Sequence, residues 1–336
     1  MKNLLYIGNK LSKTGKTETT IQTLSDALRS EGYTVCAVSD KKNKLWRLLD
    51  MVLAILKCSK KVDCVLIDTY STSNFYYAYL CSQFCRLLKL KYIPILHGGN
   101  LPNRLQNNSK LSKALFENAY INIAPSLYTQ SNFEKHGVTN IVCIPNSIKL
   151  KNYPFKQRTY ETVKLLWVRS FSEIYNPLLA IKILKSLLDE GLQASLCMVG
   201  PDNDGSLWKA KKYAEKLNVE VTFTGKLSKE AWISLSEDYN VFINTTNFDN
   251  MPVSVIEAMA LGLPVISTNV GGMPYLIETN EDGVLVNPND VAAFVEAIKR
   301  LQTNTDFTIN MALKARQKVK DFDWELVKKH WISILQ

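Results

Sequence analysis

Residues 244–268 indicate the architecture of this chain more clearly than any other segment: Asn244-Thr-Thr-Asn-Phe-Asp249-Asn-Met-Pro-Val-Ser-Val-Ile-Glu257-Ala-Met-Ala-Leu-Gly262-Leu-Pro264-Val-Ile-Ser-Thr268. An apolar strand is predicted just before it, over 239–243, and a second one at its end, over 265–268. Between them the pattern predicts a loop and then a helix that ends at Gly262 and Pro264. A strand, a loop, a helix and a strand in this order are typical of a parallel sheet.

Two carboxylates lie eight residues apart in this segment, Asp249 in the predicted loop and Glu257 in the predicted helix. The loop begins at the carboxyl edge of a parallel sheet, which is where open α/β sheets bind ligands. The backbone N–H groups of residues 250–254 lie near the helix N-terminus and suit hydroxyl or phosphate oxygens. The spacing alone fits equally well an ordinary helix whose Glu257 is favoured by the helix dipole.

Strands and helices alternate along the rest of the chain. Strands are predicted over 4–8, 34–38, 63–67, 92–96, 120–124 and 141–144, and helices over 20–30, 44–57 and 76–88. The polar stretch 149–161 is predicted to be a linker. Further strands are predicted over 164–168, 193–199 and 220–223, and helices over 178–189 and 209–217. Such alternation predicts an α/β fold with two Rossmann-like, doubly wound parallel-sheet domains that face a cleft.

The composition is that of a globular protein in a reducing compartment. The 336 residues are 46% hydrophobic and 21% charged, enough for two domains with their own cores. No apolar run reaches the roughly 18 residues that span a bilayer, and the predicted first strand leaves no room for a signal peptide. The seven cysteines are odd in number and form no CxxC pair. We therefore expect a cytoplasmic protein with free thiols.

The positive charge is concentrated in the first half of the chain. Residues 1–150 hold 20 Lys and Arg against 9 Asp and Glu, whereas residues 151–336 hold 21 against 22. A basic surface can meet nucleic acid, anionic lipid or an acidic substrate. Because no zinc-finger spacing or RNP-like run occurs, we expect no nucleic acid and favour an anionic membrane surface or a phosphorylated lipid acceptor.

The helix predicted over 44–57 carries many apolar residues between lysine-rich flanks. Packing against the sheet is the preferred explanation for its apolar residues. The flanking lysines remain available to anionic headgroups, each contributing about 1 kcal/mol near such a surface.

The residues of the 249–257 segment resemble the Glu-x7-Glu signature of retaining glycosyltransferases of the GT-B fold, family 4, also called glycosyl transferases group 1. The resemblance continues to Gly271-Gly272 and is strongest over 160–290, and the end of the chain resembles the helix that crosses back to the first domain in that fold. It implies an acceptor-binding domain over 1–150, joined by a C-terminal helix over 320–336. It also implies a nucleotide-sugar donor-binding domain over 160–319.

The resemblance also implies roles for individual residues. Glu257 would accept hydrogen bonds from the ribose hydroxyls, and Asp249, which replaces the first Glu of the signature, would contact the transferred sugar. Arg169 would neutralise the donor diphosphate. His97, followed by two glycines at a predicted strand end, would orient the sugar and the acceptor. The backbones of two segments would contact the donor: Asn250, Met251, Pro252 and Val253, and, near its base, Gly225 and Lys226.

Two positions depart from the family pattern. The loop after the first strand resembles a Gly-Gly-x-Glu segment near the donor phosphates, in which Gly15 matches and Lys16 replaces the second Gly. A diphosphate-binding Lys of the family is Tyr175 here. Two interpretations of Lys16 are open: it supplies the missing charge when the cleft closes, or it is a solvated loop lysine in an already basic region. The same loop does not fit a nucleotide-triphosphatase P-loop, because Gly8 lies two residues too far from Gly15.

No metal and no other cofactor are expected. The segment Asp202-Asn-Asp204 is similar to a metal-binding DxD motif, but Asp, Asn and the following Gly205 are also typical of a turn. A turn is the preferred interpretation.

The implied function is the transfer of a sugar from a nucleotide-diphosphate sugar to a saccharide or lipid-linked saccharide acceptor in bacterial cell-surface polysaccharide synthesis. Such an enzyme would be cytoplasmic or peripheral on the inner face of the membrane. Two alternatives remain open. One is a non-catalytic nucleotide-sugar-binding partner subunit, and the other is a different GT-B enzyme such as a nucleotide-sugar epimerase.

Overall fold

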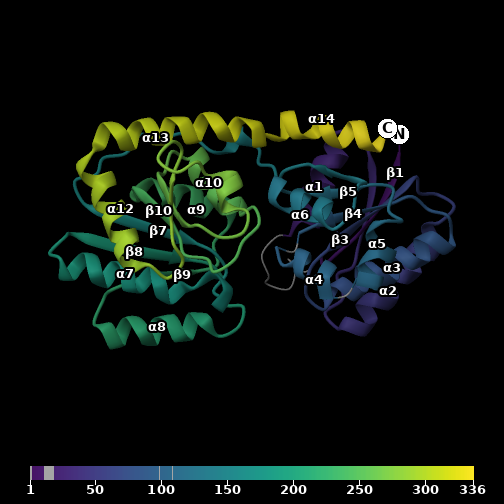
Figure 1. The fold of residues 1–336 in the computed structure, drawn as a ribbon, viewed down its shortest axis with the longest axis horizontal. Coiled ribbons are helices and arrows are strands. Elements are labelled where there is room, and N and C mark those ends of the chain that lie inside the picture. Colours follow the sequence, from purple (N-terminus) through teal and green to yellow (C-terminus); the bar gives the residue numbers. More distant parts are fainter. Residues whose placement is uncertain (1, 11–18, 98, 108) are drawn as a thin grey trace. The chain divides into compact units, whose positions relative to one another are not determined.

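The computed structural model describes residues 2–10, 19–97, 99–107 and 109–336. The chain divides into two compact units (Figure 1). The first unit consists of residues 1–146 and 326–336, and the second of residues 147–325. The second unit is thus inserted between two parts of the first, and the last helix, α14 (Trp324–Leu335), carries the chain back. No described helix is long and apolar enough to cross a membrane.

The first unit contains a six-stranded parallel sheet in the order β2-β1-β3-β4-β5-β6. Because β1 has β2 on one side and β3 on the other, the direction of strand addition reverses between β1 and β3. The strands are β1 (Asn3–Ile7), β2 (Thr34–Val38), β3 (Cys64–Thr69), β4 (Tyr92–Leu96), β5 (Asn122–Ala124) and β6 (Ile141–Cys143).

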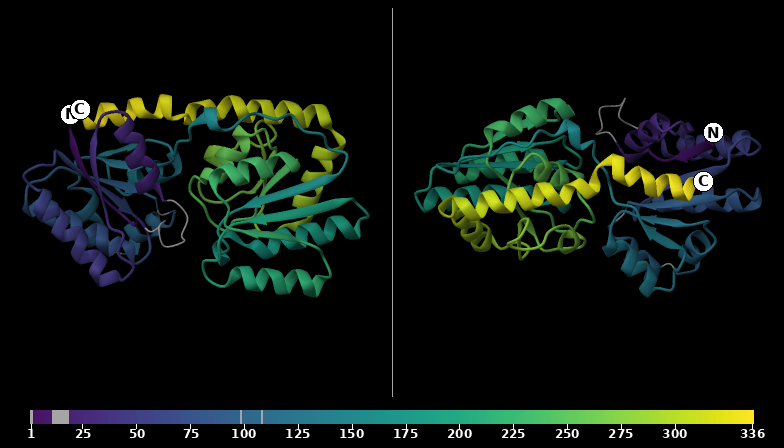
Figure 2. Two further views of the ribbon diagram at one scale, coloured as in Figure 1. Left: turned by 180° about the vertical axis from the view of Figure 1, so that it is seen from behind. Right: turned by 90° about the horizontal axis from the view of Figure 1, so that it is seen from above.

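Helices cover both faces of this sheet, with α2 and α3 packed side by side (Figures 1 and 2). They are α1 (Thr20–Ser30), α2 (Lys44–Cys58), α3 (Asn74–Leu87), α4 (Leu101–Asn107), α5 (Ser109–Phe116) and α6 (Leu127–Lys135). The core lies between the sheet and the helices and includes Ile67, Phe75 and Phe116.

The second unit contains another six-stranded parallel sheet, in the order β12-β11-β10-β7-β8-β9. This is the strand order of dinucleotide-binding sheets, and its reversal lies between β7 and β10. The predicted α/β class with two doubly wound parallel sheets is therefore confirmed. The strands are β7 (Val163–Val168), β8 (Ala194–Val199), β9 (Thr222–Gly225), β10 (Val241–Asn244), β11 (Val265–Thr268) and β12 (Val284–Val286).

Four helices of the second unit, α9, α11, α12 and α13, had not been predicted from the sequence pattern. Asp290 starts α12 by accepting a hydrogen bond from the N–H of Ala293, and Asn304 starts α13 in the same way from Phe307. The helices are α7 (Pro177–Asp189), α8 (Ser206–Leu217), α9 (Lys229–Leu235), α10 (Val253–Ala260), α11 (Met273–Leu276), α12 (Val291–Thr303) and α13 (Thr305–Lys318).

The polar stretch 149–161 is not a free linker, contrary to prediction. Tyr153, Arg158 and Tyr160 are buried in the second unit. The Arg158 guanidinium donates hydrogen bonds to four backbone carbonyls, among them those of Tyr239 (2.7 Å) and Leu261 (2.6 Å). Most of the stretch is exposed, but these three buried side chains anchor it to the second unit, and the Arg158 guanidinium meets several backbone carbonyls there.

Helix α2 also differs from expectation. Arg47, Met51 and Ile55 face the interior, but a row of large apolar residues points to solvent. Packing against the sheet therefore explains only part of the apolar character of this helix.

Candidate active site

Several predicted donor-binding residues converge where strand addition reverses in the second unit. Strands β7 and β10 are neighbours, with Leu165 opposite Val241 and Leu166 opposite Phe242. Arg169 directly follows β7, and the loop that carries Asp249 follows β10. Both side chains therefore lie at the carboxyl edge of the sheet, in the position where such sheets bind ligands.

Arg169 and Asp249 form an ion pair with little access to solvent, since their side chains are 11% and 13% exposed. The N–H of Asn250 donates a second hydrogen bond to Asp249, to Oδ1 at 2.9 Å. Burial raises the pKa of Asp249, and the Arg169 charge and the hydrogen bonds counteract only part of this effect. One cation and one carboxylate are therefore paired at the carboxyl edge of the sheet.

Two glycines are required for the backbone around Asp249. The N–H of Gly272 donates to the carbonyl of Asp249 at 2.9 Å. A Cβ on Gly271 would lie 2.0 Å from the carbonyl oxygen of Asp249, and one on Gly272 would lie 1.9 Å from that of Asn250. Any larger residue would displace the loop that carries the carboxylate.

Tyr175 lies where the family pattern has a lysine, and its ring packs against the Arg169 guanidinium. Its ring centroid lies 3.9 Å from the guanidinium carbon of Arg169. The other side of the guanidinium reaches Ser254, with Nη1 3.5 Å from Oγ. Tyr175 therefore orients Arg169 by a cation–π contact and adds no charge of its own.

The N-terminus of α10 lies beside Arg169. Pro252 precedes the helix, and its carbonyl accepts from Val255 at 3.1 Å. Within the described part of the chain, the N–H groups of Val253 and Ser254 donate to no protein acceptor. These two donors lie beside the Arg169 guanidinium, whose charge Asp249 offsets, and the N–H groups suit an anionic oxygen.

Glu257 is buried one turn further along α10, with 3% of its side chain exposed. The hydroxyl of Tyr153 donates to its Oε1 at 2.6 Å, and Lys229 forms an ion pair with the same oxygen. No described residue donates a hydrogen bond to Oε2. Burial, together with the charge of Glu257, raises the pKa of Tyr153, so its hydroxyl stays a donor. The carboxylate is thus held by one oxygen while the other is available to a ligand.

The sequence analysis missed both partners of Glu257. Tyr153 was hidden in the presumed linker, 104 residues before Glu257. Lys229 is the first residue of α9, three residues after the predicted Lys226. The predicted Gly225 lies at the end of β9, where its carbonyl accepts from Gly200 at 2.9 Å, and Lys226 is exposed. Of these lysines, the structure shows Lys229 at the site.

Asp202 and Asp204 form a turn, as predicted, and they also support the start of α8. Asp202 accepts hydrogen bonds from the N–H groups of Gly205 (3.0 Å) and Leu207 (3.3 Å). Asp204 accepts from Ser172 Oγ (2.7 Å), the N–H of Glu173 (3.1 Å) and Ser206. Partial burial acts in the opposite direction, but these hydrogen bonds lower the pKa of Asp204 to about 2. The described residues contain no group of three His, Cys, Asp or Glu side chains that could hold a metal.

In the first unit, His97 is fixed by a carboxylate that the sequence analysis did not single out. His97 Nε2 lies 2.7 Å from Asp68 Oδ1, and the Tyr6 hydroxyl donates to the same oxygen at 2.8 Å. The Asp68 side chain is 1% exposed, and its Oδ2 is buried without a partner among the described residues. The only signal in the sequence is an acid at the end of the apolar strand Cys64-Val-Leu-Ile-Asp68.

Asp68 lies where strand addition reverses in the first unit, and Gly8 is required beside it. A Cβ on Gly8 would lie 2.4 Å from Asp68 Oδ2. A hollow of about 10 Å³, the size of one water, is lined by Gly8, Asp68, Tyr70 and neighbouring residues. With Nε2 directed at Asp68, His97 presents Nδ1 as its remaining polar atom. The predicted Gly15 and Lys16 lie outside the described residues, so their roles stay predictions.

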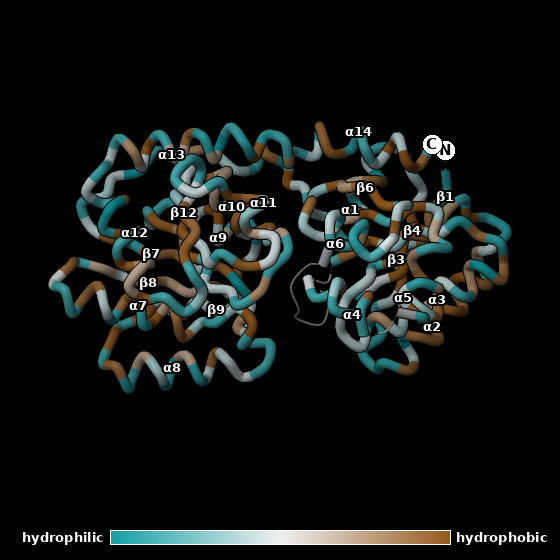
Figure 3. Tube along the Cα trace, in the orientation of Figure 1, coloured by the Kyte–Doolittle hydropathy of each residue, from teal (hydrophilic) through white to brown (hydrophobic). Residues whose placement is uncertain are grey.

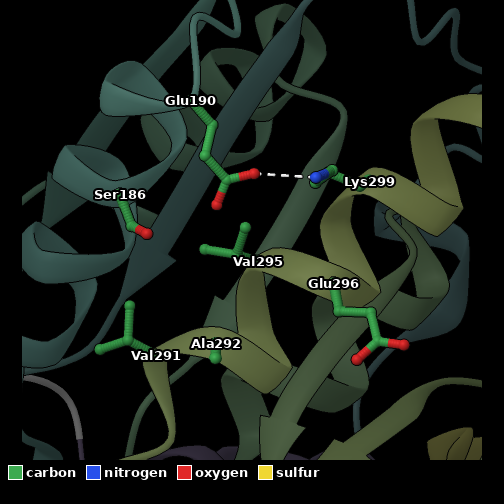
Figure 4. A pocket seen from close by; sticks show the side chains of 7 residues that line it. All are labelled: Ser186, Glu190, Val291, Ala292, Val295, Glu296 and Lys299. Carbon is green, nitrogen blue, oxygen red and sulfur yellow. Dashed lines mark hydrogen bonds and ion pairs between the residues drawn. The ribbon is translucent and has the colours of Figure 1, made fainter.

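A larger hollow of about 420 Å³ lies on the second unit beside α7 and α12 and shares no residue with this site (Figure 4). An ion pair between Glu190 and Lys299 at 2.8 Å crosses it. Its lining is otherwise short side chains and the exposed Glu296. Size alone would have selected the wrong place.

The fold and the sites together define a GT-B protein, with two Rossmann-like units that each gather polar side chains where strand addition reverses. A family model described as glycosyl transferases group 1 matches residues 151–319, half of the chain. The chain therefore belongs to the glycosyl transferases group 1, which confirms the predicted enzyme class, a glycosyltransferase.

Similar proteins agree with this assignment. The chain is 28% identical over 150 residues, 43% of its length, to sulfoquinovosyl transferase SQD2 of Arabidopsis thaliana, and the match spans only 28% of that protein. It is 24% identical over 308 residues to the amylovoran biosynthesis glycosyltransferase AmsK of Erwinia amylovora, covering 86% of this chain and 74% of AmsK. The fold is similar to that of Anabaena HepE, solved with UDP-glucose, with a TM-score of 0.83 at 16% identity over 100% of this chain and 99% of HepE.

Proposed function

We propose that this protein is a retaining glycosyltransferase of family 4 that transfers a sugar from a nucleotide-diphosphate sugar to a saccharide or lipid-linked saccharide. The observation that carries the proposal is the arrangement around α10. A buried carboxylate with one available oxygen, Glu257, lies one turn along α10 from the N–H groups of Val253 and Ser254, and the Ser254 hydroxyl faces the Arg169 guanidinium. A nucleoside diphosphate carries a ribose diol that can donate to Glu257 and a diphosphate that can accept from Arg169 and the helix N–H groups.

Each residue then has a defined role in donor binding. Glu257 Oε2 accepts hydrogen bonds from the ribose hydroxyls, and Arg169 and the N-terminus of α10 bind the diphosphate oxygens. Asp249 contacts hydroxyls of the transferred sugar. His97, oriented by Asp68, aligns the sugar and the acceptor. Arg169 and the N–H groups of α10 stabilise the negative charge that develops on the leaving diphosphate.

The transfer exchanges one bond at the anomeric carbon for another. The bond from that carbon to the donor phosphate oxygen breaks, and a bond to the acceptor hydroxyl oxygen forms on the same face. The acceptor proton moves to the leaving phosphate oxygen, and the nucleoside diphosphate departs. No protein nucleophile is required in this scheme, and the protein contributes positions and charge.

A bacterial polysaccharide role is supported by one relative. AmsK is named for amylovoran biosynthesis, and the match covers most of both chains. HepE, which shares the fold, was solved with UDP-glucose. We therefore infer that the donor is a nucleotide-diphosphate sugar, and we take UDP-glucose as the first to test.

The test is a panel of nucleotide sugars, with release of nucleoside diphosphate measured with and without saccharide acceptors. The proposal expects release with at least one donor and strong loss in the Asp249→Asn variant. Proton NMR of the product then reports the anomeric configuration, and a product inverted relative to the donor would contradict the retaining mechanism.

The same panel separates the alternatives. A partner subunit without catalysis would bind a nucleotide sugar in calorimetry but release no nucleoside diphosphate with any acceptor. An epimerase would convert the sugar without transferring it to an acceptor. Either result would overturn the proposed transfer.

A further inference from the structure

Helix α2 exposes a row of large apolar side chains. Leu49, Leu53 and Leu56 follow one another at intervals of four and three residues, so they lie along one side of the helix. The opposite side, with Met51 and Ile55, is buried against the unit. The exposed row consists of Leu45 (73% exposed), Trp46 (66%), Leu49 (50%), Leu53 (49%) and Leu56 (45%).

Helix α3 extends this apolar surface. Its Tyr76, Leu80 and Leu87 are exposed and are spaced by four and seven residues, again on one side. The two helices pack against each other, and the Tyr77 hydroxyl donates to the carbonyl of Lys44 at 3.3 Å. Because both helices cover the same face of the sheet (Figures 1 and 2), their outward residues share one outer side. We call these eight residues the α2–α3 face; Figure 3 shows brown, hydrophobic segments along both helices.

Lysines surround the α2 part of this face. All of them are exposed, and among the described residues only Lys41 of this group has an ion pair, with Asp40 at 3.7 Å. The sole other acid in this segment is Asp50, which accepts a hydrogen bond from Ser39. The lysines are Lys41, Lys42 and Lys44 before the apolar row and Lys57, Lys60 and Lys61 after it.

We propose that the α2–α3 face binds the surface of an anionic phospholipid bilayer, with α2 lying along the interface. Leucines beside a tryptophan suit the boundary between headgroups and acyl chains, and lysines at both ends suit anionic headgroups. Residues 1–150 carry the chain's excess of positive charge, which strengthens the same attraction. A second copy of this chain fits less well, because its lysines would lie opposite the lysines of the first copy and repel them.

This surface goes beyond the transfer reaction and is tested without it. The measurement is co-sedimentation with vesicles of phosphatidylcholine and phosphatidylglycerol, compared with vesicles of phosphatidylcholine alone. We expect clear binding to the anionic vesicles, weak binding to the neutral ones, and loss of binding as salt screens the lysines.

The apolar part is tested by the double variant Trp46→Ser, Leu53→Ser. Its control is Trp208→Ser, Leu313→Ser in the second unit, where the same residue types are 65% and 49% exposed, against 66% and 49% in the test pair. The test variant should bind anionic vesicles about tenfold more weakly or worse, and the control should bind like the unmodified protein. Tryptophan fluorescence should shift to shorter wavelength on vesicle addition in the control but not in the test variant.

The charged part is tested by Lys41→Glu, Lys42→Glu against Lys211→Glu, Lys212→Glu, another adjacent exposed pair. Only the Lys41→Glu, Lys42→Glu variant should bind anionic vesicles more weakly. Absence of binding by the unmodified protein, equal binding to neutral vesicles, or equal loss in test and control variants would overturn the proposal. So would a dimer in solution that the Trp46→Ser, Leu53→Ser variant dissociates. Donor turnover of the variants with a soluble acceptor stays a separate readout of the proposed transfer.

Discussion

Glu257 illustrates how a buried carboxylate is kept both stable and available. Tyr153 and Lys229 contact the same oxygen and leave Oε2 to a ligand. An ionised carboxylate that is 3% exposed would be costly without such partners. The two partners therefore hold the side chain in one orientation and also offset the cost of its burial.

The change Glu257→Gln should weaken nucleotide-sugar binding while the fold is retained. A charge-assisted hydrogen bond contributes about 1.5–3 kcal/mol, and the amide loses that charge. Isothermal titration calorimetry with the donor found in the panel measures the effect. The control is Glu296→Gln, an exposed glutamate in the hollow beside α12. Unchanged affinity in Glu257→Gln, or a comparable loss in the control, would show that the ribose lies elsewhere.

Asp68 is expected to act as a positioning residue through His97. The change Asp68→Asn keeps the size of the side chain and removes the charge that fixes the ring through Nε2. Turnover should fall about tenfold or more, which is about 1.4 kcal/mol of barrier, while donor affinity changes little. The milder variant Tyr6→Phe removes only one hydrogen bond to the same oxygen and should lose less. Wild-type turnover in Asp68→Asn would refute the role.

At the scale of elements, the loop between β7 and α7 carries both Arg169 and the Tyr175 ring that packs on it. Asp204 holds this loop from the start of α8, through Ser172 Oγ and the N–H of Glu173. The Asp202–Asp204 turn, which resembles a metal motif, therefore supports the site indirectly, because Asp204 fixes the backbone that precedes Tyr175.

The contribution of Asp204 to stability should depend on pH. The carboxyl titrates near pH 4 in an unfolded chain, and its pKa is lowered to about 2 in the folded protein. Its stabilising effect is therefore complete above about pH 4 and is lost as the pH falls toward about 2. Urea unfolding of Asp204→Asn and of the unmodified protein should differ most at neutral pH, and the difference should shrink through that interval. A difference that grows on acidification would contradict this.

Local patterns predicted the elements well and the contacts between distant residues poorly. The strands at 34–38, 92–96 and 265–268 were predicted to the residue, because continuous apolar runs bounded by polar residues are typical of buried parallel strands. Arg169, Asp249 and Glu257 were placed by a family signature. The pairs Tyr153–Glu257 and Asp68–His97 join residues 104 and 29 positions apart, and no local pattern encodes them.

The errors share a physical cause. The stretch 149–161 was taken for a linker because it is polar, but its buried Arg158 anchors it to the second unit by donating to several carbonyls. Helix α2 was expected to bury its apolar residues, yet it has too many for one face of the sheet to cover. In both cases polarity along the chain was a poor guide to burial, because pairing and available area decide it.

For the molecule as a whole, the proposed mechanism draws the positive charge needed at the donor diphosphate from the protein itself. In that proposal, Arg169 and the N–H groups at the start of α10 supply this charge. We therefore expect transfer to survive EDTA at full rate. The measurement is nucleoside diphosphate release with and without the chelator, with manganese or magnesium added back. An absolute requirement for either metal would contradict the prediction and direct attention to Asp202 and Asp204.

The insertion of residues 147–325 between two parts of the first unit has a consequence for biosynthesis. Residues 326–336 emerge from the ribosome after the whole second unit. The first unit therefore lacks its last helix while the 179 residues of the second unit are synthesised. Val327, Trp331 and Leu335 of α14 are buried, so the surfaces that they cover stay exposed until these residues have been synthesised. The second unit, which is continuous in sequence, can fold first, and the first unit is closed last although its synthesis begins earliest.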